Sequence, residues 1–391
     1  MKKILIILMV ALFTAASFAQ EGTFAINGEA KTGVIWEEVV NRNGTEVDTS
    51  KKQPPVRFGS KDDAGDFDGR FRINMEYTSP SGIMGFKGRL NWDNFNNPPT
   101  SGPNWTYGFG WGSFLNDQLV MSLGKLGASP WGTGGPEMWR ELEIIAAAGI
   151  RFEFKPKFFE GHDINVGFVL NGTDGYTDAS DNKDATLMDY LSETVVGASY
   201  KNKWFMARAA YRFDSPLDTG ERTGGDPVDE GTKLVYRFEE YALRRLLPDL
   251  SLWALGFFEG LGSSAPDQTY KTSNWVFAQY APSNFTAQMR FGFEATYART
   301  VIFVKPSFSY KFFNGLLSPG IELGYANDFG KKIWPNSDYS YIELKPKLQV
   351  DFAPDAYVAF EYYYRLENKF GLPGPPEQET QWFNLRTGIK F

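Results

Sequence analysis

This chain contains one histidine, His162, followed directly by Asp163. It is therefore the only imidazole that could act as a proton-transfer base. The chain has no cysteine, which excludes thiolate nucleophiles, disulfides and thiolate metal sites. His162 falls in a predicted short turn, so the long polar segments of the chain contain no histidine at all. Nothing therefore assembles a base, a nucleophile and an orienting group. We expect no enzymatic activity.

Carboxylates gather once in a polar segment, at Asp174, Asp178, Asp181 and Asp184. Clustered carboxylates can bind Ca²⁺. The spacing does not match the calcium-loop motif, however, and no glycine occupies the turn position. We expect a solvated loop, and we predict neither a metal site nor a bound cofactor.

Charged residues recur at every second position of many segments, and apolar residues fill the positions between them. Ionised groups in such numbers cannot lie in a dry core. If the apolar faces contact lipid, the charged faces line a wet interior, where they either set a field across a pore or pair along the wall. The arginines are Arg70, Arg72, Arg89, Arg151, Arg208, Arg212, Arg237, Arg290 and Arg386, and the glutamates are Glu76, Glu153, Glu239, Glu294, Glu322, Glu343 and Glu361.

The segments that carry these charges have the two-residue period of strands rather than the 3.6-residue period of helices. In one of them, Phe71 and Ile73 oppose Arg72. Alternating segments of about ten residues recur along the chain, as in transmembrane barrels. The count predicts an all-β, antiparallel, up-and-down barrel of about 18 strands, or 16 if two weak segments are loop. The least clear segments are 22–37 and 274–281.

The predicted connections alternate in length. Short turns are rich in Pro, Gly, Asn and Asp, which favour tight backbone conformations. Transmembrane barrels have short turns at one end and longer loops at the other, with one short exception expected here near Arg299-Thr300. The long polar segments are 41–66, 96–103, 128–142, 172–189, 214–231, 261–273, 328–338 and 368–378.

The amino terminus has the pattern of a secretion signal. Lys2 and Lys3 precede an apolar run from Ile4 to Phe13, and Ser17-Phe18-Ala19 is a small-x-small cleavage site. We therefore predict a signal peptide over 1–19 and one barrel domain over 20–391. The apolar run is too short to span a bilayer as a helix, which takes about 20 residues.

Charge excludes one class of partner. Cleavage would remove Lys2 and Lys3, which leaves 38 of the 40 basic residues against 47 acidic ones and a net charge of about −9. Nucleic-acid binding needs a basic surface, so we expect no nucleic-acid partner. An acidic lumen would favour the passage of cations over anions.

The segment from Thr380 to Phe391 shows the clearest alternation. Phe383, Leu385, Ile389 and Phe391 share one face, opposite Asn384, Arg386, Gly388 and Lys390. This segment resembles the closing strand of bacterial outer-membrane β-barrels. The resemblance implies that Phe391, with Ile389, is an assembly signal read by the barrel assembly machinery. It also implies location in the outer membrane, in contact with its lipid.

Within that class, the architecture resembles the porins, although no particular porin family is assignable. The resemblance implies a water-filled channel for passive diffusion of small hydrophilic solutes, without catalytic activity. Related porins of this size are commonly trimers, so a homotrimer is expected on resemblance alone.

The segment Ala128–Leu142 is the candidate constriction. It follows the fifth predicted strand, where general porins fold a loop into the barrel, and its Gly134-Gly135-Pro136-Glu137 is similar to elements of that loop. Glu137 and Glu141 would then face wall arginines across an eyelet. An ordinary external loop is the alternative, and Trp131 and Trp139 are bulky for an ion eyelet.

Two other functions remain open from the sequence. Trp131 and Trp139, with Trp105 and Trp111, would suit a sugar-selective porin, whose aromatic rings stack on sugars, although most such residues belong to interfacial girdles. A surface adhesin or structural barrel would share the same architecture, and fold alone does not decide between them.

Overall fold

The computed structural model describes most of the predicted barrel. The described residues are 22–43, 46–58, 60–62, 65–67, 69–92, 103–128, 131, 145–171, 194–212, 232–261, 271–296, 300–329, 339–369 and 377–391. The predicted signal peptide lies outside them, as do Glu137, Trp139, Glu141 and the aspartate-rich segment. Among the described residues, no helix is long and apolar enough to cross a bilayer.

The described chain is almost entirely antiparallel strand, as the two-residue period predicts. Two single-turn 3₁₀ helices, η3 (Leu243–Arg245) and η4 (Phe313–Gly315), lie in short turns. The strands are β1 (Thr23–Asn43), β2 (Glu46–Phe58), β3 (Ser60–Asp62), β4 (Gly65–Phe67), β5 (Arg70–Thr78), β6 (Met84–Trp92), β7 (Asn104–Phe114), β8 (Leu119–Ala128), β9 (Ile145–Phe154), β10 (Asp163–Asn171), β11 (Val195–Lys201), β12 (Phe205–Arg212), β13 (Thr232–Glu240), β14 (Leu250–Leu261), β15 (Lys271–Tyr280), β16 (Phe285–Thr296), β17 (Thr300–Tyr310), β18 (Leu317–Asp328), β19 (Ser340–Ala353), β20 (Ala356–Asn368) and β21 (Glu377–Lys390).

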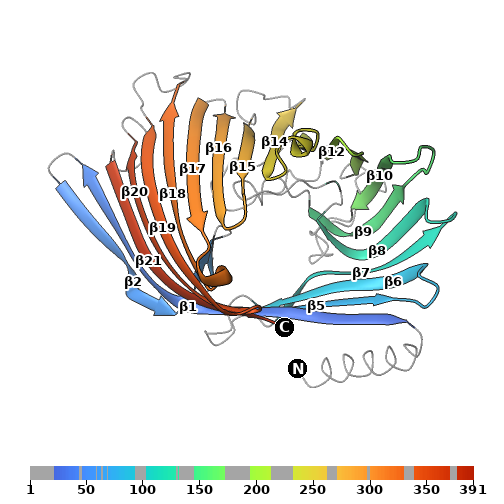
Figure 1. Ribbon diagram of the computed structural model, residues 1–391, viewed down its shortest axis with the longest axis horizontal. Coiled ribbons are helices and arrows are strands. Elements are labelled where there is room, and N and C mark those ends of the chain that lie inside the picture. The colour runs from blue at the N-terminus through green and yellow to red at the C-terminus, as the bar shows by residue number, and fades with distance from the viewer. Residues whose placement is uncertain are drawn as a thin grey trace, which may run out of the picture.

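The ring closes through β1. Its first part pairs with β5, from Thr23↔Thr78 to Lys31↔Arg70. On its other edge it pairs with β21, and every strand from β5 to β21 pairs with the next. The closed ring therefore contains 18 strands, β1 and β5 to β21, arranged around a centre in Figure 1. The prediction of 18 strands is confirmed, and both uncertain segments are strands, in β1 and β15.

The nineteenth strand of the sheet corrects one prediction. The segment 41–66 was expected to be a polar loop, but β1 continues to Asn43 and β2 pairs with its second half. Their register runs from Asn43↔Glu46 to Val34↔Phe58, with an irregularity after Trp36. Of this hairpin, β1 belongs to the ring, whereas β2 lies beside it and is not one of its 18 strands (Figure 1).

Short turns join neighbouring strands at one end of the ring. Between β7 and β8, the chain reverses through Leu115, Asn116 and Asp117, all with positive φ. Asn and Asp tolerate this left-handed conformation better than other residues with a side chain. The connection between β16 and β17, at the opposite end, is also short, as expected, since β16 ends at Thr296 and β17 begins at Thr300.

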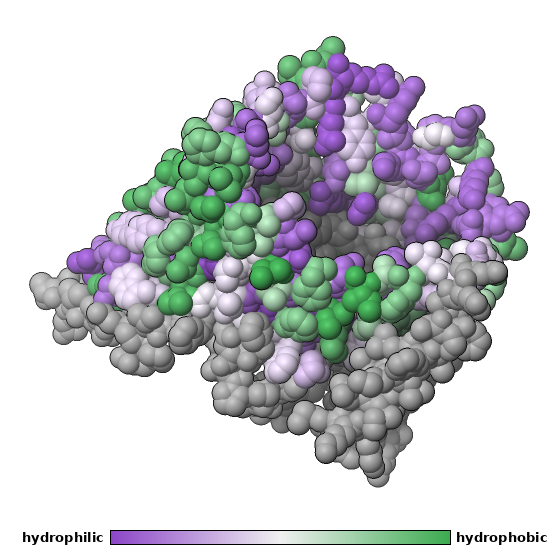
Figure 2. Space-filling view, turned by 60° about the horizontal axis from the view of Figure 1, so that its bottom comes forward, coloured by the Kyte–Doolittle hydropathy of each residue, from purple (hydrophilic) through white to green (hydrophobic). Residues whose placement is uncertain are grey.

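The two faces of the ring differ in chemistry. On β16, Phe291 is 47% exposed, whereas Arg290 beside it is only 5% exposed and faces the other way. Exposed apolar side chains of this kind suit contact with lipid, so their face is the outer one. In Figure 2, hydrophobic residues cover the wall toward the viewer and hydrophilic residues gather around the central hollow.

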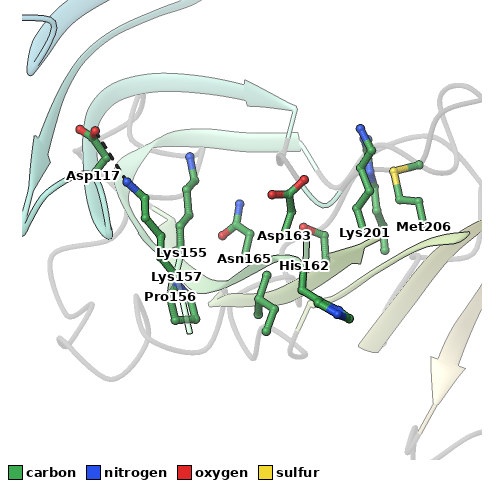
Figure 3. Close-up of a pocket in the computed structure, with 12 residues that line it drawn as sticks. Asp117, Lys155, Pro156, Lys157, His162, Asp163, Asn165, Lys201 and Met206 are labelled. Carbon is green, nitrogen blue, oxygen red and sulfur yellow. Dashed lines mark ion pairs between the residues drawn. The ribbon is translucent and has the colours of Figure 1, made fainter. Parts of the chain in front are cut away.

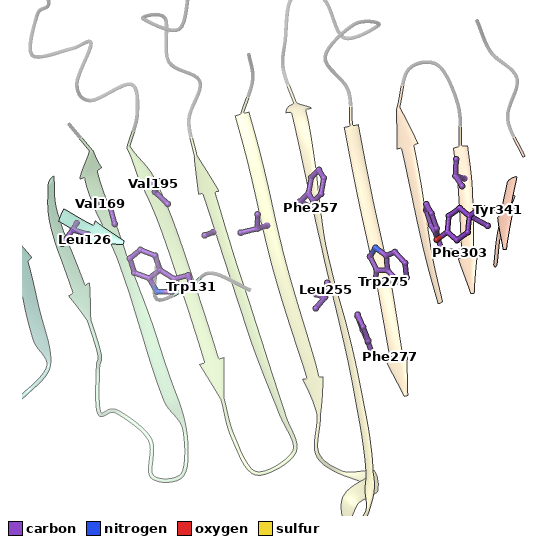
Figure 4. Close-up of a cluster of buried hydrophobic side chains, with 14 of the residues drawn as sticks. Leu126, Trp131, Val169, Val195, Leu255, Phe257, Trp275, Phe277, Phe303 and Tyr341 are labelled. Atoms are coloured by element: carbon purple, nitrogen blue, oxygen red, sulfur yellow. The ribbon is translucent and has the colours of Figure 1, made fainter. Parts of the chain in front are cut away.

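An apolar belt interrupts the charged inner face. It crosses the strands from β7 to β19 and contains Val169, Val195, Leu255, Trp275 and Tyr341 (Figure 4). These side chains occupy the same face of their strands as the inner charges, and they are almost fully buried. The inner wall is therefore part charged and part densely packed.

Candidate channel wall

Ion pairs organise the charged wall near the closing seam. Arg72 Nη1 lies 3.2 Å from Glu29 Oε1, which joins β5 to β1. Lys87 Nζ lies 2.7 Å from Glu76, which joins β6 to β5. Since opposite charges directly across an antiparallel pair attract, these contacts follow from the register of the strands.

Hydrogen bonds position the other basic residues of this sector. Arg89 donates from Nε to Asn74 Oδ1 at 2.7 Å, and its guanidinium lies 5.1 Å from the ring centre of Tyr107. Arg70 begins β5 at the same face, where it pairs with Lys31 of β1 in the register. Three of the predicted wall arginines, Arg70, Arg72 and Arg89, thus lie together on β5 and β6.

Arg151 is the most enclosed basic residue of the β8–β9 sector. Its Nε lies 3.0 Å from Glu153 Oε1, and its Nη2 donates to Ser122 Oγ at 3.2 Å. The guanidinium also lies 5.2 Å from the ring centre of Phe109. A buried charge is costly unless it is paired and hydrogen-bonded, and here both conditions are met.

A second group of ion pairs spans β16 to β21. Arg290 pairs with Glu322, and Lys305 Nζ lies 3.1 Å from Glu343. Glu361, 3% exposed in its side chain, accepts from Arg386 Nη2 at 2.8 Å and lies 3.6 Å from Lys347 Nζ. The sequence left open whether these charges set a field across a pore or pair along the wall, and in this group they pair along the wall.

Two predicted wall arginines differ from this pattern. Arg208 lies on the inner face of β12, directly across from Arg237 of β13, and none of the described residues forms an ion pair with it. Arg212 ends β12, and its side chain lies outside the part of the chain that the structure describes.

Of the four residues singled out in the candidate constriction, Trp131, Glu137, Trp139 and Glu141, the structure describes Trp131 alone. Its side chain is fully buried and lies against Gly167 of β10 and Gly197 of β11. These glycines are cross-strand partners on the inner face, beside Val169 and Val195. Trp131 therefore lies inside the ring, against its inner wall (Figure 4).

Stacked aromatic rings extend along the inner wall beyond this point. Trp253 and Phe277 stack with ring centres 5.0 Å apart, and Trp275 stacks on Phe303 at 5.3 Å. Tyr341 follows 6.1 Å from Phe303 and carries the Arg365 guanidinium 3.9 Å from its ring centre. This row was not predicted from the sequence. Its signal was an aromatic residue on the polar face of several successive strands.

The tryptophans proposed for sugar stacking do not share one surface. Trp105 is partly exposed and meets Phe86 edge-on with ring centres 6.5 Å apart, on the lipid-facing side. Trp111 lies on the inner side, packed against the buried cluster, and Trp131 is enclosed. Trp139 lies outside the described residues.

Phe391 contacts β1 where the first and last strands of the ring meet. Its backbone N–H donates to Gly28 O at 3.1 Å and its carbonyl accepts from Gly28 N at 2.7 Å. The phenyl ring stacks on Phe71 with ring centres 5.9 Å apart. Ile389, two residues earlier, is also exposed on the outer face.

His162 has no catalytic surroundings in the described part of the chain. Its Nδ1 lies 2.5 Å from the Tyr200 hydroxyl, and Phe159 packs nearby. Asp163 begins β10, and its side chain points into the neighbouring cavity rather than to the imidazole (Figure 3). The described residues also contain no group of three or more side chains suited to a metal ion.

Comparison with known proteins assigns no family. No protein-family model matches the chain, and no curated protein is significantly similar to it in sequence. A mutant porin of Rhodopseudomonas blastica has a TM-score of 0.48 and 13% identity, over 94% of this chain and 100% of that chain. The outer-membrane-expressed OmpT of Vibrio cholerae has a TM-score of 0.48 and 12% identity, over 95% of this chain and 98% of that chain.

The closed ring, with its apolar outer face and charged inner face, defines the protein as a transmembrane β-barrel.

Proposed function

We propose that this protein is an outer-membrane porin, a water-filled channel for passive diffusion of small hydrophilic solutes. The observation that carries the proposal is the concentration of ionised side chains on the inner face of an 18-strand ring. Such groups need water around them. Barrels of 16–18 strands are wide enough to leave an aqueous channel.

Solutes would be sorted by size and by the field of the wall. Trp131 lies against the inner wall of the ring, which supports a constriction in the segment that contains it. We infer that Glu137 and Glu141, a few residues further on, form that constriction opposite basic wall residues. The channel mechanism needs no conformational step, because diffusion through a wet lumen is passive.

The sugar-selective alternative has weaker support. Stacking on a sugar requires an accessible ring face, whereas Trp275, Phe277, Phe303 and Tyr341 are each less than 10% exposed. General diffusion of hydrophilic solutes is therefore favoured. A surface adhesin would share the barrel and would not conduct.

Partners follow from the same proposal. The exposed apolar outer face would contact outer-membrane lipid. Phe391, seated at the seam, and Ile389 would be presented to the barrel assembly machinery. A homotrimer is the expected assembly by resemblance to porins.

Planar-bilayer recording of the refolded protein tests the proposal directly. We expect stepwise open conductance that heat-denatured protein does not produce. Maltooligosaccharides titrated into the same bilayer should not block the current. A block that saturates with sugar concentration would instead support the sugar-selective channel. A folded, heat-modifiable barrel that never conducts would reject the porin and favour an adhesive or structural role.

A further inference from the structure

A basic cavity opens on the inner wall at the short-turn end of the ring. Its volume is about 420 Å³, and strands β10, β11 and β12 line it together with the turn between β9 and β10 (Figure 3). Lys155, Lys157, Lys201 and Arg208 contribute four positive charges to its lining, against Asp117 and Asp163. In outer-membrane barrels the short turns face the periplasm, so this cavity would lie at the periplasmic mouth.

The acidic residues neutralise only part of this charge. Asp117 lies 4.0 Å from Lys157, and both side chains are well exposed, so water screens the contact. Lys155 lies 3.5 Å from Glu153, a carboxylate that Arg151 already shares. Asp163 lies directly across from Lys201 in the register of β10 and β11, yet neither Lys201 nor Arg208 forms an ion pair within 4.0 Å with a residue that the structure describes.

Most strand cations of the inner face are paired, whereas Arg89 instead donates to Asn74 and Lys271 lies over the ring of Phe257. The strand cations of the inner face that contact a carboxylate include Lys31, Arg72, Lys87, Arg151, Arg237, Arg290, Lys305, Lys347, Arg365 and Arg386. The register places Lys201 opposite Met206, so that Arg208 is its diagonal neighbour on the same face. Diagonal neighbours lie roughly 7–8 Å apart, which leaves room for one small anion between the two cations.

We propose that this cavity is a binding subsite for a small oxyanion, held between Lys201 and Arg208. The guanidinium offers paired N–H donors and the ammonium a mobile point charge, a combination that suits phosphate or carboxylate. Ser199, directly across from Arg208, supplies a further hydroxyl donor. The inference rests on the proposed porin function and refines it, because the subsite would concentrate anionic solutes at the periplasmic mouth of an otherwise acidic protein.

Inorganic phosphate is the probe. Isothermal titration of the refolded protein in detergent should show saturable phosphate binding, weakened at least tenfold in the variant carrying both Lys201→Gln and Arg208→Gln. A matched variant with Lys311→Gln and Lys390→Gln removes two exposed charges at the same end of the ring, away from the cavity, and should bind like the unaltered protein. Asp163→Asn should strengthen binding, because it removes a negative charge from the lining.

A second readout separates this subsite from the channel itself. In bilayers with a potassium chloride gradient, loss of Lys201 and Arg208 should shift the reversal potential toward cations, and the matched variant should not. The channel could still conduct while Lys201→Gln and Arg208→Gln change neither phosphate binding nor the reversal potential. That result would reject the subsite and retain the porin. Phosphate binding without any conductance would instead reject the porin and retain the subsite.

Discussion

The indole of Trp131 lies so close to Gly197 that a Cβ atom on that glycine would come within 2.2 Å of the ring. Gly167, its cross-strand partner, leaves the remaining space, since a Cβ there would lie 2.9 Å from the indole. The absence of side chains at these two paired glycines thus leaves space on the inner wall for the indole of Trp131. This contact packs Trp131 against β10 and β11.

Adding a side chain at Gly197 should destabilise the barrel. Gly197→Ala forces the indole or the backbone to move, and overpacking of this kind costs about 1–3 kcal/mol. Denaturant unfolding of the refolded protein measures the loss. Gly110→Ala is the control, because the nearest atom to its added Cβ is 3.9 Å away. If Trp131→Ala does not relieve the cost of Gly197→Ala in the double variant, the two residues are not coupled.

Neutralising Glu361 should cost more than neutralising an exposed carboxylate. Glu361→Gln leaves Arg386 and Lys347 without their buried partner, a loss on the order of 3 kcal/mol in the free energy of unfolding. Glu76→Gln breaks the pair with Lys87, in which both side chains are more than 40% exposed, and should cost about 1 kcal/mol or less. Equal losses would show that the wall around Glu361 is fully hydrated.

Removal of Phe391 should impair assembly. The deletion loses both backbone hydrogen bonds to Gly28 and the ring contact with Phe71. We expect a lower surface level, measured by heat-modifiable folded protein in outer-membrane fractions. Phe352→Ala is the matched control, since Phe352 is 57% exposed and Phe391 56%. Normal levels of the truncated protein would reject a role for Phe391 in assembly.

Loss of the proposed acidic constriction should change ion preference. Glu137→Gln combined with Glu141→Gln removes two negative charges from the segment that follows Trp131, so cation preference should fall. The reversal potential in a salt gradient reports the change. Glu160→Gln with Asp355→Asn removes the same charge from exposed short turns and should have a smaller effect. An unchanged potential would place Glu137 and Glu141 away from the path of the ions.

Much of the barrel was predictable because lipid and water impose opposite demands on neighbouring residues. Alternation such as Phe71 against Arg72, or Phe291 against Arg290, marks strands with one face toward each medium. The β1–β2 hairpin was missed for the same reason. The segment 41–66 contains Pro54-Pro55 and many polar residues, and without an apolar alternate face it resembles a loop.

The sequence by itself determined the strand pattern of most of the ring, a count of about 18 strands with 16 as the alternative, and the separation of apolar from charged faces, since each depends on local two-residue periodicity. The tertiary structure decided which charges neutralise one another, because partners such as Arg290 and Glu322 lie on strands whose register is set by the closed ring. It also decided that Trp131 rests on two glycines and that Lys201 and Arg208 share one cavity. These relationships depend on contacts between strands, which no periodicity along the chain encodes.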